Sequence, residues 1–149
     1  MADFYLTRKL SHIDNMILVA TTQLFLPTVW FAYVSHEYVL MCSVLMAYAG
    51  STSFHSLGTE FDTLHHIDIL TSRTSFAINL VYSLQYVPIS YLILLSNNLA
   101  SAYLISCILY TSGNPLWLYA HIYFHTWTML SSFLLVAQCK ERKRLQKIE

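Results

Sequence analysis

Histidines recur at helical spacing in apolar parts of this chain. His121 and His125 stand in the string HIYFH, and a spacing of four residues on a helix places both imidazoles on one face, about 6 Å apart. Ser51 and His55 repeat the spacing in STSFH. Three neutral imidazoles with an open fourth position form a catalytic type of zinc site. His55, His121 and His125 are therefore candidate zinc ligands, and the alternative is a set of hydrogen-bonded histidines between helices.

Hydrolysis is the chemistry that such a ligand set predicts. A zinc-bound hydroxide attacks a carbonyl while the metal stabilises the developing oxyanion. The reaction also needs a proton carrier, and HIYFH contains no carboxylate for that role. Asp68 is the candidate general base and then acid. Ser51, one turn before His55, is the candidate donor to the oxyanion, or else it orients the ligand.

The charge distribution indicates the elements that must position these residues. The chain has 149 residues, of which 56% are apolar and 11% are charged, against roughly a quarter charged in soluble domains. Stretches without any charge cover 15–36, 38–59 and 74–139, or 22, 22 and 66 residues. A spanning helix needs about 20 apolar residues. We therefore predict an all-α integral membrane protein, a compact bundle of about five transmembrane helices.

Local signals divide these stretches into elements. Pro27 should kink the first helix, and the run Ser96–Asn98 can break the fourth. Asn114 can cap the fifth helix. His65 and His66 fall in the connection before the third helix, where they bind metal, shuttle protons or are simply solvated. The expected helices cover about 16–35, 37–57, 67–86, some of 89–111, and 115–138.

A basic tail gives the expected orientation. Lysines and arginines are concentrated in residues 140–149. We expect a single transmembrane domain over residues 1–139, followed by this solvated tail. The tail should be cytoplasmic, because basic segments are retained on that side. Arg8 and Lys9 argue weakly for the opposite orientation. The chain crosses the membrane twice between the starts of the third and fifth helices. The five site residues should thus share the lumenal or outer side, opposite the tail.

Other features narrow the function classes. Balanced formal charge excludes a nucleic-acid-binding protein in general terms, and three scattered cysteines indicate no disulfide framework. One face of the expected third helix is polar, and it serves either interhelical hydrogen bonds or a hydrated path to the metal. Arg73 lies beside this face and should pair with an acidic group or reach toward the membrane interface. That face carries Asp68, Ser72, Ser75, Asn79 and Ser83.

The ordered set of motifs resembles the CREST superfamily, which comprises alkaline ceramidases, progestin and adipoQ receptors, and post-GPI-attachment lipases with their myomaker-like relatives. The resemblance covers about residues 47–136. It implies a zinc-dependent intramembrane hydrolase acting on a membrane lipid, usually as an amidase or phospholipase. Carried over by position, His55, His121 and His125 match the zinc ligands, and Ser51 and Asp68 match the motif's Ser and Asp.

The chain also departs from that family. Two of the family's seven helices are missing, so walls of a lipid pocket are absent or come from another subunit of a homo-oligomer. The interval from His55 to Asp68 is longer than in ceramidases, which makes Asp62 an alternative carboxylate. Two rival functions follow: a non-catalytic, zinc-stapled membrane protein acting as lipid receptor or in fusion and assembly, and a channel or transporter.

Overall fold

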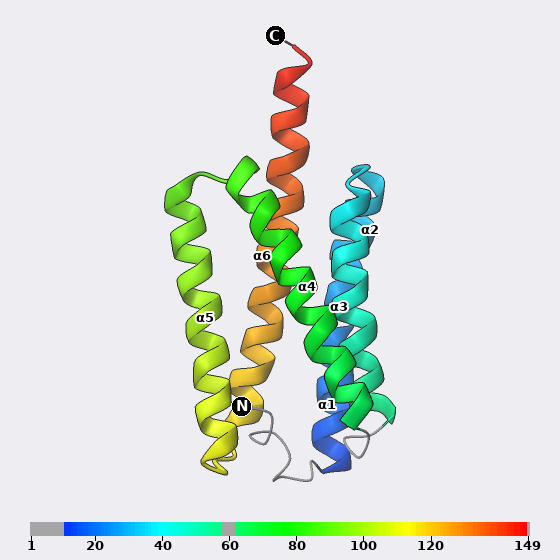
Figure 1. Cartoon of the computed structure of the whole chain (residues 1–149), viewed down its shortest axis with the longest axis vertical. Helices are drawn as coiled ribbons and strands as arrows, with labels where there is room; N and C mark the ends of the chain where they lie inside the picture. Colours follow the sequence, from blue (N-terminus) through cyan, green and yellow to red (C-terminus); the bar gives the residue numbers. More distant parts are fainter. Residues whose placement is uncertain (1–10, 58–61, 149) are drawn as a thin grey trace.

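The computed structural model describes residues 11–57 and 62–148, and within these ranges it contains helices and no strands. The chain runs back and forth along one bundle axis (Figure 1). Its helices are α1 (His12–Thr22), α2 (Phe25–Val34), α3 (Tyr38–Leu57), α4 (Asp62–Tyr86), α5 (Ile89–Thr111) and α6 (Trp117–Gln146). The predicted all-α class is confirmed.

α1 and α2 are two halves of one interrupted rod. Ser11 caps α1, because its hydroxyl accepts from the Asp14 N–H at 3.0 Å while the Asp14 carboxylate accepts from the Ser11 N–H at 3.3 Å. The rod breaks at Gln23, four residues before Pro27, since a proline ring crowds the carbonyl of that residue and offers it no N–H. The Gln23 carbonyl instead accepts from Leu26 at 3.1 Å. The predicted kink thus lies one turn before the proline.

Three helices differ from the sequence prediction. α4 begins at Asp62, so His65, His66 and Asp68 lie within the helix and not before or at its start. α5 is continuous through residues 96–98, where the Asn98 side chain donates to the Leu94 carbonyl at 2.8 Å. Side-chain bonding to the preceding turn lets the helix carry asparagine without breaking. α6 continues eight residues beyond the predicted end.

α6 is the centre of the bundle. It packs against every other helix, whereas α5 rests mainly on α6 and meets α4 in few places. Residues from α2, α3 and α6 form the buried core, namely Ala32, Leu40, Leu135, Val136 and Cys139. In Figure 1, α4 and α5 are joined at one end of the bundle and diverge toward the other.

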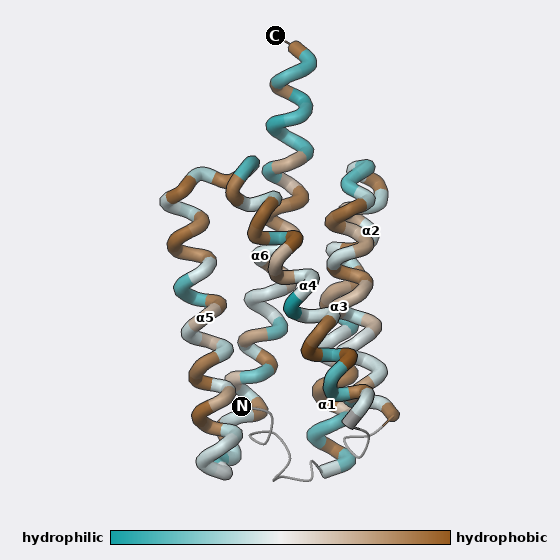
Figure 2. Tube along the Cα trace, in the orientation of Figure 1, coloured by the Kyte–Doolittle hydropathy of each residue, from teal (hydrophilic) through white to brown (hydrophobic). Residues whose placement is uncertain are grey.

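The exterior is strongly apolar. Large apolar side chains such as Trp30, Leu70 and Ile108 are about two-thirds exposed, and apolar colours dominate the tube outside the end of α6 (Figure 2). Two helical spans, 12–34 and 89–111, are long and apolar enough to cross a membrane. A contiguous apolar exterior is typical of a surface that meets lipid or another protein.

Two side chains at the basic end of α6 contact the bundle, while most of residues 140–148 are exposed. Lys143 Nζ lies 2.8 Å from a carboxylate oxygen of Glu37, which is buried in the turn between α2 and α3. The hydrogen bond to Glu37 raises the pKa of Lys143. Arg142 donates to the Gln85 carbonyl at the end of α4 at 3.2 Å. These contacts attach the last helical turns to the bundle end that lies away from the N-terminus of α1 (Figure 1).

Candidate metal centre

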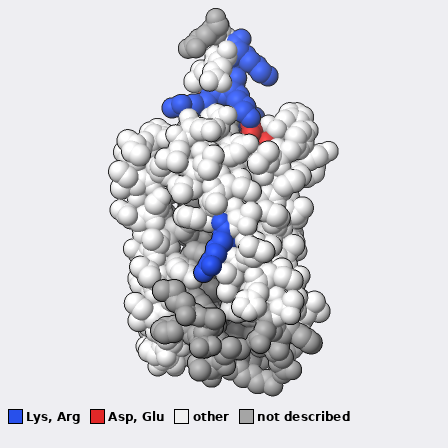
Figure 3. Space-filling view, in the orientation of Figure 1, with Lys and Arg blue, Asp and Glu red and all other residues white. Residues whose placement is uncertain are grey.

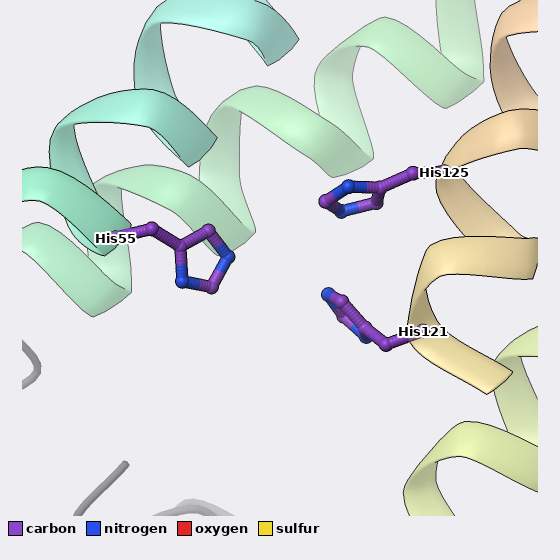
Figure 4. Close-up of side chains that lie close together, drawn as sticks. All are labelled: His55, His121 and His125. Carbon is purple, nitrogen blue, oxygen red and sulfur yellow. The ribbon is translucent and has the colours of Figure 1, made fainter. Parts of the chain in front are cut away.

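Three histidines from two helices meet inside the bundle. His55 comes from the last turn of α3, and His121 and His125 come from successive turns of α6. One ligand nitrogen of each lies within 4.8 Å of the other two. The rings point into one common space (Figure 4). A tetrahedral metal with bonds of 2.0–2.1 Å needs nitrogens about 3.3 Å apart, so small side-chain rotations would bring the three to bonding distance.

The orientation of His125 is set by a threonine on α1. The Thr21 hydroxyl donates its proton to the Leu18 carbonyl at 2.8 Å and also lies 3.1 Å from His125 Nδ1. When the hydroxyl donates its single proton to the Leu18 carbonyl, His125 Nδ1 carries the hydrogen in the second bond. The other nitrogen, Nε2, then has the free lone pair that a metal requires.

The other two histidines differ in their partners. His121 Nδ1 lies 3.1 Å from the hydroxyl of Ser106 on α5, which leaves its Nε2 for the common space. His55 Nδ1 is buried and has no hydrogen-bond partner within the described residues. A buried polar atom without a partner is costly.

A close helix contact brings α4 to this site. A Cβ at Gly50 of α3 would overlap the hydroxyl of Thr71 and lie 3.3 Å from the Asp68 Cα, so α3 approaches α4 closely only because residue 50 is glycine. Ser51 follows directly on α3, and His55 lies one further turn along. The contact therefore places Asp68 of α4 close to the segment of α3 that carries Ser51 and His55.

A cavity of about 910 Å³ joins the predicted site residues. Its lining includes Ser51, Asp68 and the three histidines, together with apolar side chains of α4, α5 and α6. Asp68 does not belong to the group of atoms close enough to share a metal. Its Oδ1 accepts from Ser72 at 3.4 Å, and Oδ2 has no such bond to any described residue. Asp68 is thus placed beside the histidine cluster without being one of its ligand atoms.

The polar face predicted on α4 lines the same cavity in full. Two of its members also bond to other helices: Ser75 to the Ser43 hydroxyl on α3 at 2.9 Å, and Asn79 to the Ser132 hydroxyl on α6 at 3.4 Å. Asn79 Oδ1 is buried without a partner among the described residues. The face thus serves interhelical bonding and gives the cavity a polar wall.

The remaining sequence candidates fall outside the cluster. His65 also lines the cavity from α4, and its neighbour His66 is exposed; neither offers a nitrogen to the metal group. The side chain of Asp62 lies outside the described residues, so this alternative carboxylate stays untested. Arg73 lines the cavity and has no acidic partner in the described chain. The expected acidic pairing of Arg73 is therefore absent from these ranges.

Two residues of the site had no signal in the sequence. Thr21 and Ser106 contact the histidines only because α1 and α5 flank α6 at this level. Single hydroxyls on apolar helices are common, and nothing in the local sequence marks these two. The donor set of three imidazoles suits zinc, copper, nickel or iron. Histidines that are held only by hydrogen bonds to Thr21 and Ser106, with no metal between them, would lie in the same positions.

The chain matches no protein-family model, no curated protein and no solved structure. The function is therefore argued from the site alone.

Proposed function

We propose that this protein is a zinc-dependent intramembrane hydrolase that cleaves an amide or ester bond of a membrane lipid. The single observation that carries the proposal is the convergence of three histidine nitrogens within 4.8 Å in a cavity that also presents Ser51 and Asp68. A purely structural three-histidine site needs neither of those two groups. The cavity is mostly lined by apolar side chains, which suits the chains of a lipid.

A five-span arrangement supports the lipid as substrate. α1 and α2 form one span, and α3 to α6 supply four more, of which α4 and α6 carry the polar site residues inward. The basic end of α6 is cytoplasmic by the positive-inside rule, and the site lies toward the lumenal or outer side. The cavity is lined by residues of α4, α5 and α6, and a lipid enters it from the bilayer between α4 and α5.

The chain's own residues divide the reaction between them. Zinc bound by the three histidines supplies Lewis acidity and lowers the pKa of a water molecule. Asp68 accepts a proton from the attacking water as the new carbon–oxygen bond forms. It returns that proton to the leaving nitrogen or oxygen as the scissile bond breaks. Ser51 donates a hydrogen bond to the carbonyl oxygen as negative charge develops there.

Metal analysis and lipid turnover on the purified protein test this proposal. We expect stoichiometric zinc in the wild type and in Asp68→Asn, and loss of zinc in His121→Ala. Turnover in an untargeted lipid screen should fall about 100- to 10,000-fold in Asp68→Asn, the usual contribution of a general base. His66→Ala is the matched control, since this exposed histidine is outside the cluster.

Each result separates the candidates. Wild-type protein without zinc would contradict the hydrolase. Zinc that is lost in His121→Ala, with no lipid changed by any variant, would favour a zinc-stapled receptor or assembly factor instead.

A further inference from the structure

We propose that Arg73 binds the phosphate of a lipid held in the cavity, so that the substrate is a phospholipid and not a neutral lipid such as ceramide. The inference rests on the proposed function for the position of the scissile carbonyl. The binding of phosphate by Arg73 itself does not require turnover.

Arg73 lies apart from the other described basic residues. These all lie between residues 140 and 147, and Figure 3 shows one basic side chain well below them, among uncharged side chains and beside a hollow. Among the described residues that line the cavity, only Asp68 and Arg73 are Asp, Glu, Lys or Arg. No ion pair joins them among the described contacts. The guanidinium is therefore available to an anion inside the cavity.

Within residues 11–57 and 63–148, the cavity walls from the neighbouring helices offer Arg73 no carboxylate. The cavity wall from α5 and α6 presents apolar side chains, hydroxyls, Cys107, Gln138 and the two histidines. The Arg73 side chain lines the cavity and is exposed, and an unpaired charge at membrane depth is costly unless it meets water, a counter-ion or the membrane interface. A permanently charged, five-donor group in such a cavity is suited to a bidentate phosphate.

The register along α4 sets the depth of this contact. Asp68 and Arg73 are five residues apart, which is about 7.5 Å along a helix axis. A helical side chain leans toward the N-terminus of its helix, so Arg73 extends back toward the level of Asp68. In a glycerophospholipid only a few bonds separate the phosphate from the acyl carbonyls. One molecule can thus place its phosphate at Arg73 and a carbonyl at the histidines.

Lipid binding by the full-length protein in detergent micelles tests the inference. The probes are a fluorescent phosphatidylcholine and the matching diacylglycerol, which lacks the phosphate. Arg73→Gln should weaken phosphatidylcholine binding at least tenfold and leave diacylglycerol binding within twofold of wild type. Arg73→Lys should weaken phosphatidylcholine binding less than Arg73→Gln does, because lysine keeps the positive charge but lacks the two parallel N–H donors of the guanidinium. Arg142→Gln, at the opposite end, is the control and should bind as wild type does.

Two further measurements show whether the bound phosphate belongs to the lipid and whether the variants keep an intact site. Inorganic phosphate at millimolar concentration should not displace the phospholipid, and zinc content should be equal in all variants. Unchanged phosphatidylcholine binding in Arg73→Gln, an equal loss for both lipids, or displacement by inorganic phosphate would each overturn the inference. Phosphate-dependent binding without any turnover would support it while contradicting the hydrolase, so the two failures are distinguishable.

Discussion

At the scale of single residues, the histidine cluster depends on hydroxyls that the metal would never touch. Thr21 presents an oxygen that bonds both to the Leu18 carbonyl and to His125 Nδ1. With the hydroxyl proton on the Leu18 side, Nδ1 carries the hydrogen and Nε2 is free for a metal. A threonine on α1 thereby favours one tautomer of a histidine on α6.

Replacing this hydroxyl should weaken metal binding without unfolding the site. We expect Thr21→Val to lower zinc affinity about 10- to 100-fold, the usual effect of losing a partner of a ligating histidine. Titration against a competing chelator measures it. Thr126→Val is the control, because the Thr126 hydroxyl donates only to the Ile122 carbonyl on the same helix. Equal affinities in the two variants would show that Thr21 does not select the tautomer.

At the scale of elements, the closest approach between α3 and α4 decides whether the two halves of the site meet. The glycine at position 50 allows Thr71 and the Asp68 backbone to lie against α3. Asp68 and the Ser51–His55 face are carried by these two helices. A separation of the helices at this level would move Asp68 away from the histidines while leaving each helix intact.

A methyl group at position 50 should therefore destabilise the protein and misplace Asp68. We expect Gly50→Ala to reduce the free energy of unfolding by about 1–3 kcal/mol, as overpacking does, with a lower midpoint in thermal unfolding in detergent. The double variant Gly50→Ala with Thr71→Ala should recover part of the loss, since the Thr71 hydroxyl is the nearest atom. A Gly50→Ala protein as stable as wild type would contradict the close contact.

At the scale of the whole molecule, the chain places its chemistry and its charge at opposite ends. The α5–α6 turn and the histidine cluster lie toward one end, and the basic turns of α6 extend beyond the other (Figure 1). Lys143 pairs with Glu37, and Arg142 bonds to the end of α4. These contacts hold the basic residues at the bundle end where the interface with the cytoplasm is expected.

Labelling in sealed vesicles tests that orientation. Ser112→Cys in the exposed α5–α6 turn and Lys147→Cys near the end of α6 should react with an impermeant maleimide from opposite sides. The second should react from the cytoplasmic side, because a basic segment is retained there. The wild type, with its own three cysteines, measures the background. Reaction of both variants from the same side would contradict the expectation that α6 crosses the membrane between residues 112 and 147.

Much of this arrangement was predictable from residues that are near one another in the chain. Charge-free stretches and proline and glycine positions predicted the helices within a few residues at most boundaries. Alternation of direction then predicted that His55 and the pair His121 and His125 would share a level. The start of α4 and the end of α6 were predicted wrongly, because both helices continue through polar residues of the kind that usually lies outside a spanning helix. At the end of α6, Lys143 and Arg142 also bond to neighbouring elements.

The sequence by itself determined the helical class, the candidate ligands and their common level, because helical spacing and hydrophobic length are local properties of the chain. Only the tertiary structure decided that three imidazoles converge, that Thr21 and Ser106 orient two of them, and that Arg73 lines their cavity. Those facts depend on which helices become neighbours and how closely they pack. Packing of that kind is set by shape complementarity across the whole bundle, and no short stretch of residues contains it.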